Sequence, residues 1–417
     1  MSKPDVRIAE VLVSAGLGGY YVDDLLAKQR GVHHDGLFLL GRPVTRHFQR
    51  IREPGQAVNV MLVADDGTVG LGDCVSVTYS GAAGREPMLH PRGLARQLRR
   101  HTRSLVGQPV ESFQQLDCEV LRLSARWRLP AAARFGLSQA ALDLVSRVRR
   151  EPGAVVVARE FALVSKPRRV PIMAQSGDER YLHVDKMIMK AADVIPHGLF
   201  DTPEALGTGG VHLLEYVRWL KRRLRRHAPD TYRPTFQFDV YGALGVVSGQ
   251  SVSRMARFLH RLGRLAAPYP TRVECPFIGS SRAQTIEVMA ALRAQVRRSD
   301  VRVEVVADEW CNTLADVEAF VQQHAADMIQ IKVPDFGTFS ESIAAARACR
   351  KGGVKVFLGG SCNETDISAR ATVQVAMGIG ADQMYAKPGL DVDTGMMIVW
   401  NEMMRTLTWL KAFGKRA

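Results

Sequence analysis

The stretch Thr235–Asp239 (TFQFD) is a short aromatic and β-branched run that ends in an aspartate, and two similar runs follow it. The second, 273–274 (VE), ends at Glu274, and the third, 303–308 (VEVVAD), ends at Asp308. The three acids are spaced by 35 and 34 residues, about the length of one strand plus one helix. Because the carboxyl ends of the strands of a parallel barrel lie around one mouth, we expect these carboxylates to converge in one pocket.

Three like charges held together are unfavourable unless a cation neutralises them. Oxygen ligands without accompanying cysteine or histidine favour Mg²⁺, with Mn²⁺ as a substitute. An acid at a strand end can also cap the helix that follows, and for any single one of Asp239, Glu274 and Asp308 this is the simpler interpretation. Three consecutive units at nearly equal spacing favour a metal site instead.

The next strand–helix unit contributes a base rather than an acid. Lys332 lies in the apolar run 327–333 (DMIQIKV), with Gln330 two residues earlier and therefore on the same face of a strand. A lysine that points outward could extend its ammonium between helices to water. A lysine that points inward beside a metal would have a lowered pKa and could act as a general base. Facing three metal-binding acids, it would suit removal of a proton next to a carboxylate, with the metal taking up negative charge.

The surrounding 240 residues alternate strand and helix patterns. Amphipathic segments separate most of the expected strands, which are 171–174, 186–189, Thr235–Asp239, 273–274, 301–307, 328–333, Lys355–Leu358 and Gln383–Tyr385. Repeated strand–helix units over this length predict an α/β fold of the (β/α)₈ TIM-barrel type, with room for an irregular early unit. A doubly wound open sheet is the competing fold, and the absence of a Gly-rich phosphate loop after the first strand weighs against it.

The residues before this region have a different organisation. Strands at 56–63 and 70–77 flank a turn at 65–67 and predict a hairpin, and helices are expected at 91–106 and Ala131–Arg149. We therefore expect two domains, an α+β domain over 1–165 and the barrel over 166–417, with the boundary near Lys166 and Pro167.

Composition narrows the class of protein. With 46% apolar and 24% charged residues, no signal-like segment and no apolar run of bilayer length, we expect a cytoplasmic protein without a membrane partner. Six dispersed cysteines without a paired motif are expected to be reduced thiols. The net charge of +14 includes basic runs at 96–103 and 221–226, which could bind nucleic acid or be solvated helix faces. Without a nucleic-acid motif, the second interpretation is preferred.

Several segments together resemble the methylaspartate ammonia-lyase family of the enolase superfamily, and the resemblance runs over nearly the whole chain. They are 174–181 (AQSGDERY), 184–188 (VDKMI), 239–242 (DVYG), 306–313 (VADEWCNT), 330–335 (QIKVPD), 359–365 (GGSCNET) and 387–389 (KPG). In the N-terminal region, 79–81 (YSG) and 84–85 (GR) are similar to a loop that closes over the active site of that family.

The resemblance implies an enolase-like barrel with an N-terminal capping domain, and a carbon–nitrogen lyase that acts on an amino acid in amino-acid catabolism. Asp239, Glu274 and Asp308 would bind Mg²⁺, and Lys332 would remove the C3 proton of (2S,3S)-3-methylaspartate so that ammonia leaves and mesaconate forms. His197 would lie on the opposite face of the substrate, as the base for the other C3 epimer or as a carboxylate ligand. From its sequence position alone, a surface loop is the simpler interpretation for this histidine.

Further residues are expected to contact the substrate: Gln175, Gln330, Ser361 and Cys362, the last through its backbone N–H. Thr78 stands where the family commonly has a glutamine, and Tyr385 stands where it has an aliphatic residue that lines the pocket for the methyl group. These two positions put the preferred substrate in question, whereas the reaction class is unaffected. The resemblance also implies a homodimer.

Two other functions stay open. One is a different enolase-superfamily activity, an epimerase or cycloisomerase, which would resemble a pattern with a Lys-x-Lys pair on the second barrel strand. Here Lys186 and Lys190 lie four residues apart. The other is a basic binding protein that has kept the barrel and lost catalysis, against which the complete set of three acids and Lys332 argues.

Overall fold

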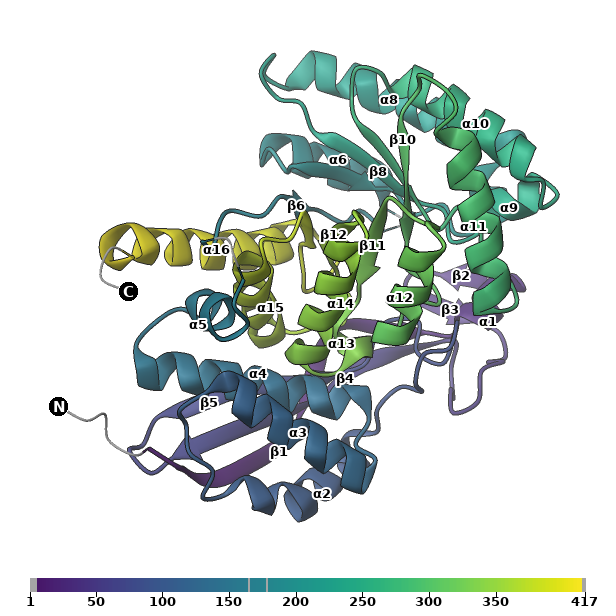
Figure 1. The fold of residues 1–417 in the computed structure, drawn as a ribbon. Coiled ribbons are helices and arrows are strands. Elements are labelled where there is room, and N and C mark those ends of the chain that lie inside the picture. The colour runs from purple at the N-terminus through teal and green to yellow at the C-terminus, as the bar shows by residue number, and fades with distance from the viewer. Residues whose placement is uncertain (1–5, 164–165, 178, 415–417) are drawn as a thin grey trace.

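A computed structural model describes residues 6–163, 166–177 and 179–414 of the chain. Eight parallel strands close a barrel in the order β10-β11-β12-β13-β6-β7-β8-β9, which confirms the predicted (β/α)₈ fold (Figure 1). The strands are β6 (Ile172–Met173), β7 (Val194–His197), β8 (Thr235–Asp239), β9 (Thr271–Glu274), β10 (Val303–Ala307), β11 (Met328–Ile331), β12 (Lys355–Leu358) and β13 (Gln383–Tyr385).

Helices surround the barrel and carry the chain from each strand to the next. The longer ones are α6 (Arg180–Met189), α8 (Val211–His227), α10 (Val252–Ala266), α11 (Arg282–Val296), α12 (Leu314–Gln322), α14 (Phe339–Lys351), α15 (Asp366–Ile379) and α16 (Asp393–Phe413). Short helices α7 (Pro203–Leu206), α9 (Ala243–Val247) and α13 (Val333–Phe336) lie in the connections. Hydroxyl side chains cap several of these helices, and Thr313 and Thr338 form complete capping boxes, so the sequence itself fixes where the helices begin.

The second strand of the barrel is where the sequence prediction was wrong. The segment 186–189 was expected to be a strand, but it is the end of α6, and the strand is β7 at Val194–His197. Val184, Met187 and Ile188 are the buried residues of α6, and their spacing of three and four is helical rather than alternating. The correction places His197 at the end of a strand, with its side chain 9% exposed, instead of in a surface loop.

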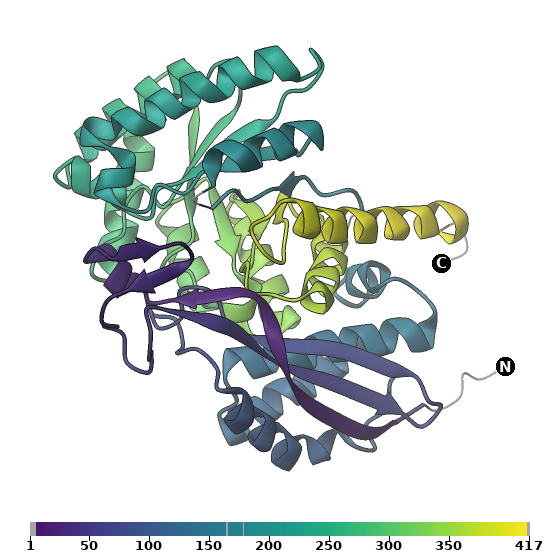
Figure 2. The same cartoon turned by 180° about the vertical axis from the view of Figure 1, so that it is seen from behind.

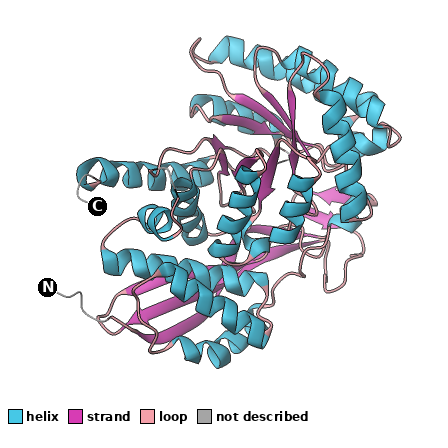
Figure 3. Cartoon of the chain, in the orientation of Figure 1, coloured by secondary structure: helices cyan, strands magenta, loops and turns pink. Residues whose placement is uncertain are grey.

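The N-terminal region is an antiparallel sheet covered on one face by helices, as the contrast of strands and helices in Figure 3 shows. The sheet has the order β1-β4-β5, and β4 and β5 form the predicted hairpin. Its elements are β1 (Ile8–Asp23), β4 (Arg52–Ala64), β5 (Val69–Val75), α2 (Pro91–His101), α3 (Phe113–Trp127), α4 (Ala131–Arg149) and α5 (Gly153–Glu160). The boundary expected at 165 falls on residues 164–165, which lie outside the described residues.

A smaller excursion of the chain lies between β1 and β4. It consists of α1 (Leu25–Gln29) and the hairpin of β2 (His33–Asp35) and β3 (Phe38–Leu40). Figure 2 shows this excursion beside the barrel, and Lys28 of α1 donates a hydrogen bond to Asp201 of the barrel at 3.3 Å. One end of the N-terminal sheet therefore reaches the barrel.

Helix α4 joins the two regions. Its residues are small or apolar around most of its circumference, and 13 of them are buried, as expected of a helix packed on more than one side. Ser138 of α4 accepts a hydrogen bond from the backbone N–H of Phe339 at 2.9 Å, and Asp117 of α3 accepts one from Ser340 at 2.9 Å. The N-terminus of α14 is thus bound by side chains of the N-terminal region, which fixes how that region sits on the barrel.

The predicted basic runs are largely solvated helix faces. On α8, Arg222, Arg225 and Arg226 are exposed while Leu220 and Leu224 are buried, and the run on α2 has the same division. Within residues 6–163, 166–177 and 179–414, no helix combines the length and apolar character needed to cross a bilayer.

Close packing of α4 on β5 yields a prediction about stability. A Cβ added to Gly72 would meet the backbone oxygen of Gly136, so helix and strand approach as closely as they do only because Gly72 has no side chain. Gly72→Ala is expected to destabilise the fold by about 1–3 kcal/mol through overpacking. Thermal denaturation followed by circular dichroism should show a lower Tm.

Gly93 in α2 provides the matched control, because a Cβ there meets nothing nearer than 4.0 Å. Gly93→Ala should leave the Tm unchanged or raise it slightly, since alanine is the better helix former by about 1 kcal/mol. Equal melting temperatures for Gly72→Ala and the unaltered chain would contradict the packing argument.

Candidate active site

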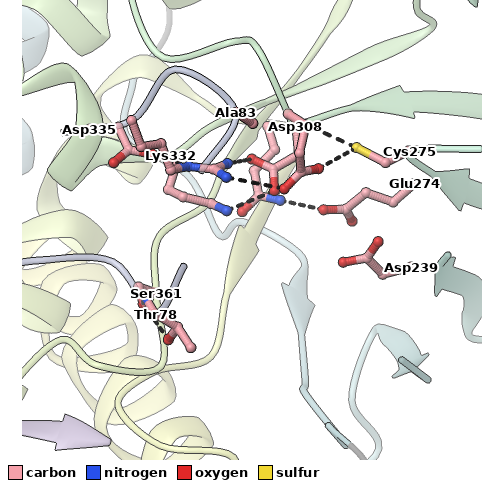
Figure 4. A network of polar contacts seen from close by, with 12 residues as sticks. Thr78, Ala83, Asp239, Glu274, Cys275, Asp308, Lys332, Asp335 and Ser361 are labelled. Atoms are coloured by element: carbon pink, nitrogen blue, oxygen red, sulfur yellow. Dashed lines mark hydrogen bonds and ion pairs between the residues drawn. The ribbon is translucent and has the colours of Figure 1, made fainter. Parts of the chain in front are cut away.

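The three acids predicted from spacing meet at the mouth of the barrel. Asp239 ends β8, Glu274 ends β9, and Asp308 directly follows β10. The three side chains are buried, and Figure 4 shows them approaching one another from neighbouring strands. Parallel pairing of β8 with β9 and of β9 with β10 produces this arrangement, because it places successive strand ends side by side.

Each of the three carboxylates also has a neighbour in the protein. Asp239 accepts from the backbone N–H of Tyr241 at 3.2 Å, and Glu274 accepts from Gln237 at 2.7 Å and from Gln330. Asp308 accepts a hydrogen bond from Lys332 Nζ at 2.7 Å. In these side-chain positions, no three His, Cys, Asp or Glu groups of the described residues are spaced to hold a metal ion.

The electrostatics of this group nevertheless suit a cation. Burial, followed by repulsion from Glu309 and Asp308, raises the pKa of Asp239 well above its usual value. Burial and the charges of Asp239 and Asp308 do the same to the pKa of Glu274. Carboxylates that disfavour one another's charge at adjacent strand ends are the hard oxygen donors that Mg²⁺ prefers. The residues present therefore fit a magnesium ion by their chemistry.

Lys332 lies directly after β11, as the residue before α13, and its side chain is 10% exposed. Burial and the charge of Arg85 lower its pKa, but attraction to Asp308, Glu309 and Asp335 outweighs them and raises it. The expected lowering of this pKa referred to a lysine beside a bound metal ion, whereas in the chain alone the three acids favour the ammonium form. The same ion pair, together with Arg85, holds the pKa of Asp308 below its usual value although burial opposes this.

His197 lies across the pocket from Lys332, at the end of β7. Its Nε2 is 3.5 Å from Asp239 Oδ2 and 3.3 Å from the hydroxyl of Tyr385, which ends β13. Burial raises the pKa of Tyr385, which keeps its hydroxyl protonated and able to donate a hydrogen bond. Tyr385, one of the two positions expected to influence substrate preference, thus contacts the histidine.

The expected substrate ligands come from three places around the same mouth. Gln175 follows β6 and donates to the backbone oxygen of Ala386 at 3.1 Å. Ser361 and Cys362 follow β12, and both meet Thr78, whose hydroxyl lies 3.0 Å from Ser361 Oγ and 3.0 Å from Cys362 Sγ. Thr78, the other position expected to influence substrate preference, therefore contacts two other expected ligands.

A buried ion pair lies beneath the loop that carries Ser361 and Cys362. Lys387 donates to Glu364 at 2.7 Å and to the backbone oxygen of Gly359 at 3.0 Å, and both charged side chains are 0% exposed. Glu364 in turn accepts from the backbone N–H of Ser361 at 2.9 Å. The pair fixes the loop relative to β13 and so fixes the position of Ser361.

All the predicted site residues line a single pocket. They are Thr78, Gln175, His197, Asp239, Glu274, Asp308, Gln330, Lys332, Ser361, Cys362 and Tyr385. By contrast, Lys186 lies on α6 and Lys190 directly follows that helix, and they pair with Asp393 at 2.5 and 2.9 Å. They are therefore not a lysine pair on a barrel strand, which is what the alternative epimerase or cycloisomerase pattern requires.

The sequence analysis missed residues that the N-terminal region adds to this pocket. Tyr20, Asp23, Lys28 and Arg52 line it, and Arg52 pairs with Asp23 at 2.7 Å. Arg85 pairs with Asp308, which lines the pocket, and with Glu309 and Asp335, which had no predicted role. The sequence held a signal for Glu309 and Asp335, since each lies within three residues of a predicted site residue. Nothing in the sequence indicated that Arg85 contacts these two acids.

Comparison with known proteins agrees with this geometry. The family model described as methylaspartate ammonia-lyase N-terminus matches residues 6–162, and the model described as methylaspartate ammonia-lyase C-terminus matches residues 164–412. Methylaspartate ammonia-lyase 1 of Carboxydothermus hydrogenoformans is 41% identical over 409 residues, which is 97% of each chain. The methylaspartate ammonia-lyase of Clostridium tetanomorphum is 40% identical over 96% of this chain and 98% of its own.

Solved structures give the same result. A magnesium complex of β-methylaspartase from Clostridium tetanomorphum has a TM-score of 0.91 at 38% identity, covering 99% of this chain and 100% of that one. The Citrobacter amalonaticus methylaspartate ammonia-lyase containing (2S,3S)-3-methylaspartic acid has a TM-score of 0.94 at 38% identity, covering 97% and 100%. Muconate lactonizing enzyme from Pseudomonas fluorescens, 17% identical with a TM-score of 0.61, shares the fold. The chain belongs to the methylaspartate ammonia-lyase family, a family of carbon–nitrogen lyases.

Proposed function

We propose that the protein removes ammonia from (2S,3S)-3-methylaspartate to give mesaconate, reversibly and with Mg²⁺, as part of amino-acid catabolism. The observation that carries the proposal is the joint position of Lys332 and three strand-end carboxylates in one pocket. The relatives named methylaspartate ammonia-lyase, one with this substrate bound and one with magnesium, support the choice of substrate and metal.

Asp239, Glu274 and Asp308 would hold the metal. Bound there, Mg²⁺ would supply positive charge that stabilises the carboxylate next to C3 as negative charge develops on it, and that disfavours the protonated form of Lys332. A buried pocket strengthens such interactions because little water screens them.

The chain's own residues carry out the proton transfer and the positioning. Lys332 Nζ accepts the C3 proton, the C–H electrons form the C2–C3 double bond, and the C2–N bond breaks to release ammonia. Gln175, Gln330, Ser361 and Cys362 would bind the carboxylates and amine so that the C3–H bond faces the lysine. His197, on the other side of the pocket, would serve the opposite C3 epimer or hold a carboxylate.

Thr78 and Tyr385 are proposed to determine which amino acid reacts best. Tyr385 places a ring and a hydroxyl beside His197 where a smaller aliphatic side chain would leave space. Thr78 is shorter than glutamine and is hydrogen-bonded to Ser361 and Cys362. Both changes alter the pocket around the substrate, whereas Lys332 and the three acids are left intact, so substrate preference can change without a change of reaction.

The direct test is ultraviolet detection of mesaconate. The enzyme with Mg²⁺ should form it from 3-methylaspartate, and removal of the metal with EDTA should abolish the signal until Mg²⁺ is restored. Mn²⁺ is expected to restore part of the rate, because it accepts the same oxygen ligands. Aspartate and N-substituted 3-methylaspartates, run in parallel, would show how Thr78 and Tyr385 set the preference. Absence of product from every one of these amino acids would reject the ammonia-lyase proposal.

The assignment of the base predicts the effect of Lys332→Ala. Turnover of the 2S,3S substrate should fall by about 10²–10⁴-fold or more, because the proton acceptor is gone. Binding of Mg²⁺, measured by calorimetry, should persist because the three carboxylates remain.

Lys186→Ala is the matched control, since this lysine lies on α6 with its side chain 32% exposed and does not line the pocket. Its kcat should equal that of the unaltered enzyme. A Lys332→Ala variant with near-normal kcat, or a loss in Lys186→Ala instead, would overturn the assignment.

We also propose that the protein is a cytoplasmic homodimer that acts on a small-molecule amino acid and binds neither nucleic acid nor membrane. Sedimentation at two protein concentrations would give the assembly state.

A further inference from the structure

The guanidinium of Arg85 is buried among carboxylates that belong to the barrel. Its side chain is 0% exposed, although it comes from residues 76–90, the loop between β5 and α2 that we call the capping loop. Its three nitrogens contact three acids: Nη2 lies 3.3 Å from Asp308, Nη1 lies 3.2 Å from Glu309, and Nε lies 2.8 Å from Asp335. Arg85, which belongs to the N-terminal region, therefore contacts three acidic residues of the barrel.

Two of these acids are close to the proposed base. Asp335 lies three residues after Lys332, and Glu309 lies next to Asp308, so both are near enough to attract the Lys332 ammonium. In the view of Figure 4, Asp335 and Lys332 are on one side of this network and Asp308 is toward Cys275 and Glu274. Lys332 nevertheless donates its hydrogen bond to Asp308 at 2.7 Å, on the side of the pocket.

A second contact of the Glu309 carboxylate does not compensate its charge. Glu309 accepts from the thiol of Cys275 at 2.7 Å. A thiol is a weak donor, and it leaves the negative charge of the glutamate in place. Without Arg85, these two carboxylates would still attract the Lys332 ammonium, which already pairs with Asp308 at 2.7 Å.

We propose that Arg85 is a positioning residue for catalysis: it binds Glu309 and Asp335 so that they do not capture the ammonium of Lys332. The inference rests on the proposed function, in which Lys332 is the base. The inference adds a role for the N-terminal region. The positive charge that pairs with Glu309 and Asp335 is the guanidinium of Arg85, which belongs to the capping loop and not to the barrel.

The geometry requires an arginine. A guanidinium has a planar fork of donors that can meet several carboxylates at once, whereas a lysine has one compact ammonium on a flexible stem. Arg85 uses its Nε and both Nη atoms on three different acids. A lysine at this position would keep the charge but leave at least one of the carboxylates to Lys332.

Contacts of the capping loop hold Arg85 in place. Asn312 donates from its side chain to the backbone oxygen of Ala83 at 2.7 Å, and Gly84 has a φ of +80° and passes close to the ring of Trp310. The backbone at Gly84 disfavours any residue with a side chain, so the loop can follow this path over the barrel. Arg85 reaches its partners when the capping loop is seated on the barrel.

The test compares Arg85→Lys with the unaltered enzyme under saturating Mg²⁺. The lysine variant should fold, and its kcat should fall by about 10-fold or more while KM changes by less than about threefold, because substrate ligands are untouched. Arg85→Met should lose about 100-fold or more in kcat. Replacing Asp335 as well, in Arg85→Met/Asp335→Asn, should recover at least about tenfold over Arg85→Met, since one competing carboxylate no longer carries charge.

Arg134→Met is the matched control. Arg134 also joins the N-terminal region to the barrel, through the backbone oxygen of Phe336 at 3.0 Å and Glu341 at 3.4 Å, without touching the pocket carboxylates. It should lower the Tm while kcat stays within about twofold. A normal kcat in Arg85→Lys, an equal loss of kcat in Arg134→Met, or no recovery in the double variant would overturn the inference. An unaltered enzyme that forms no mesaconate would instead reject the proposed function and, with it, the role of Arg85.

Discussion

Mutual repulsion among buried carboxylates is the constraint around which this active site is organised. Asp239, Glu274, Asp308 and Glu309 are all at most 2% exposed, and Asp335 adjoins them. Removing such charges from water is costly unless opposite charges or hydrogen bonds compensate them. The barrel places Lys332 among them, in contact with Asp308. Amide donors and Arg85 of the N-terminal region add further compensation, and the proposed magnesium ion would add more.

These sources of compensation are distributed in a way that matches their proposed roles. Glu274 is bound by the uncharged amides of Gln237 and Gln330, which leave its charge available to a metal. Glu309 and Asp335, which are not proposed ligands, are the carboxylates that Arg85 binds most directly. Asp308 lies between the two groups, with Lys332 on one oxygen and Arg85 on the other. The carboxylates therefore form two groups: those that line the pocket, and Glu309 and Asp335, which pair with Arg85.

The side chains at the ends of the barrel strands could be predicted from the sequence, but the contacts of Arg85 could not. Asp239, Glu274 and Asp308 were found because the repeat of the barrel converts a spacing along the chain into proximity in space. Lys332 was found because a lysine in an apolar run is unusual. Arg85 received no role because its partners lie more than 220 residues away, and no local pattern records such a contact.

The strand expected at 186–189 was wrong because a short apolar run fits a helix and a strand almost equally, and burial at Val184, Met187 and Ile188 is what distinguishes them. The charges around Lys332 could not be predicted from the sequence either. The pKa of Lys332 in the chain alone depends on burial, on Arg85 and on three acids. Two of those acids and Arg85 are brought to it by the tertiary structure, which no local pattern records.

The same reasoning separates reaction from substrate in this chain. The groups proposed to move the proton are fixed by the charge balance, since changing any one of them would leave a buried neighbour uncompensated. Tyr385 and Thr78 are outside that balance: each is neutral and hydrogen-bonded, one to His197 and the other to Ser361 and Cys362. A neutral residue at the pocket wall can change at little electrostatic cost. Substrate preference is therefore free to vary in this fold while the paired charges beneath it keep the chemistry constant.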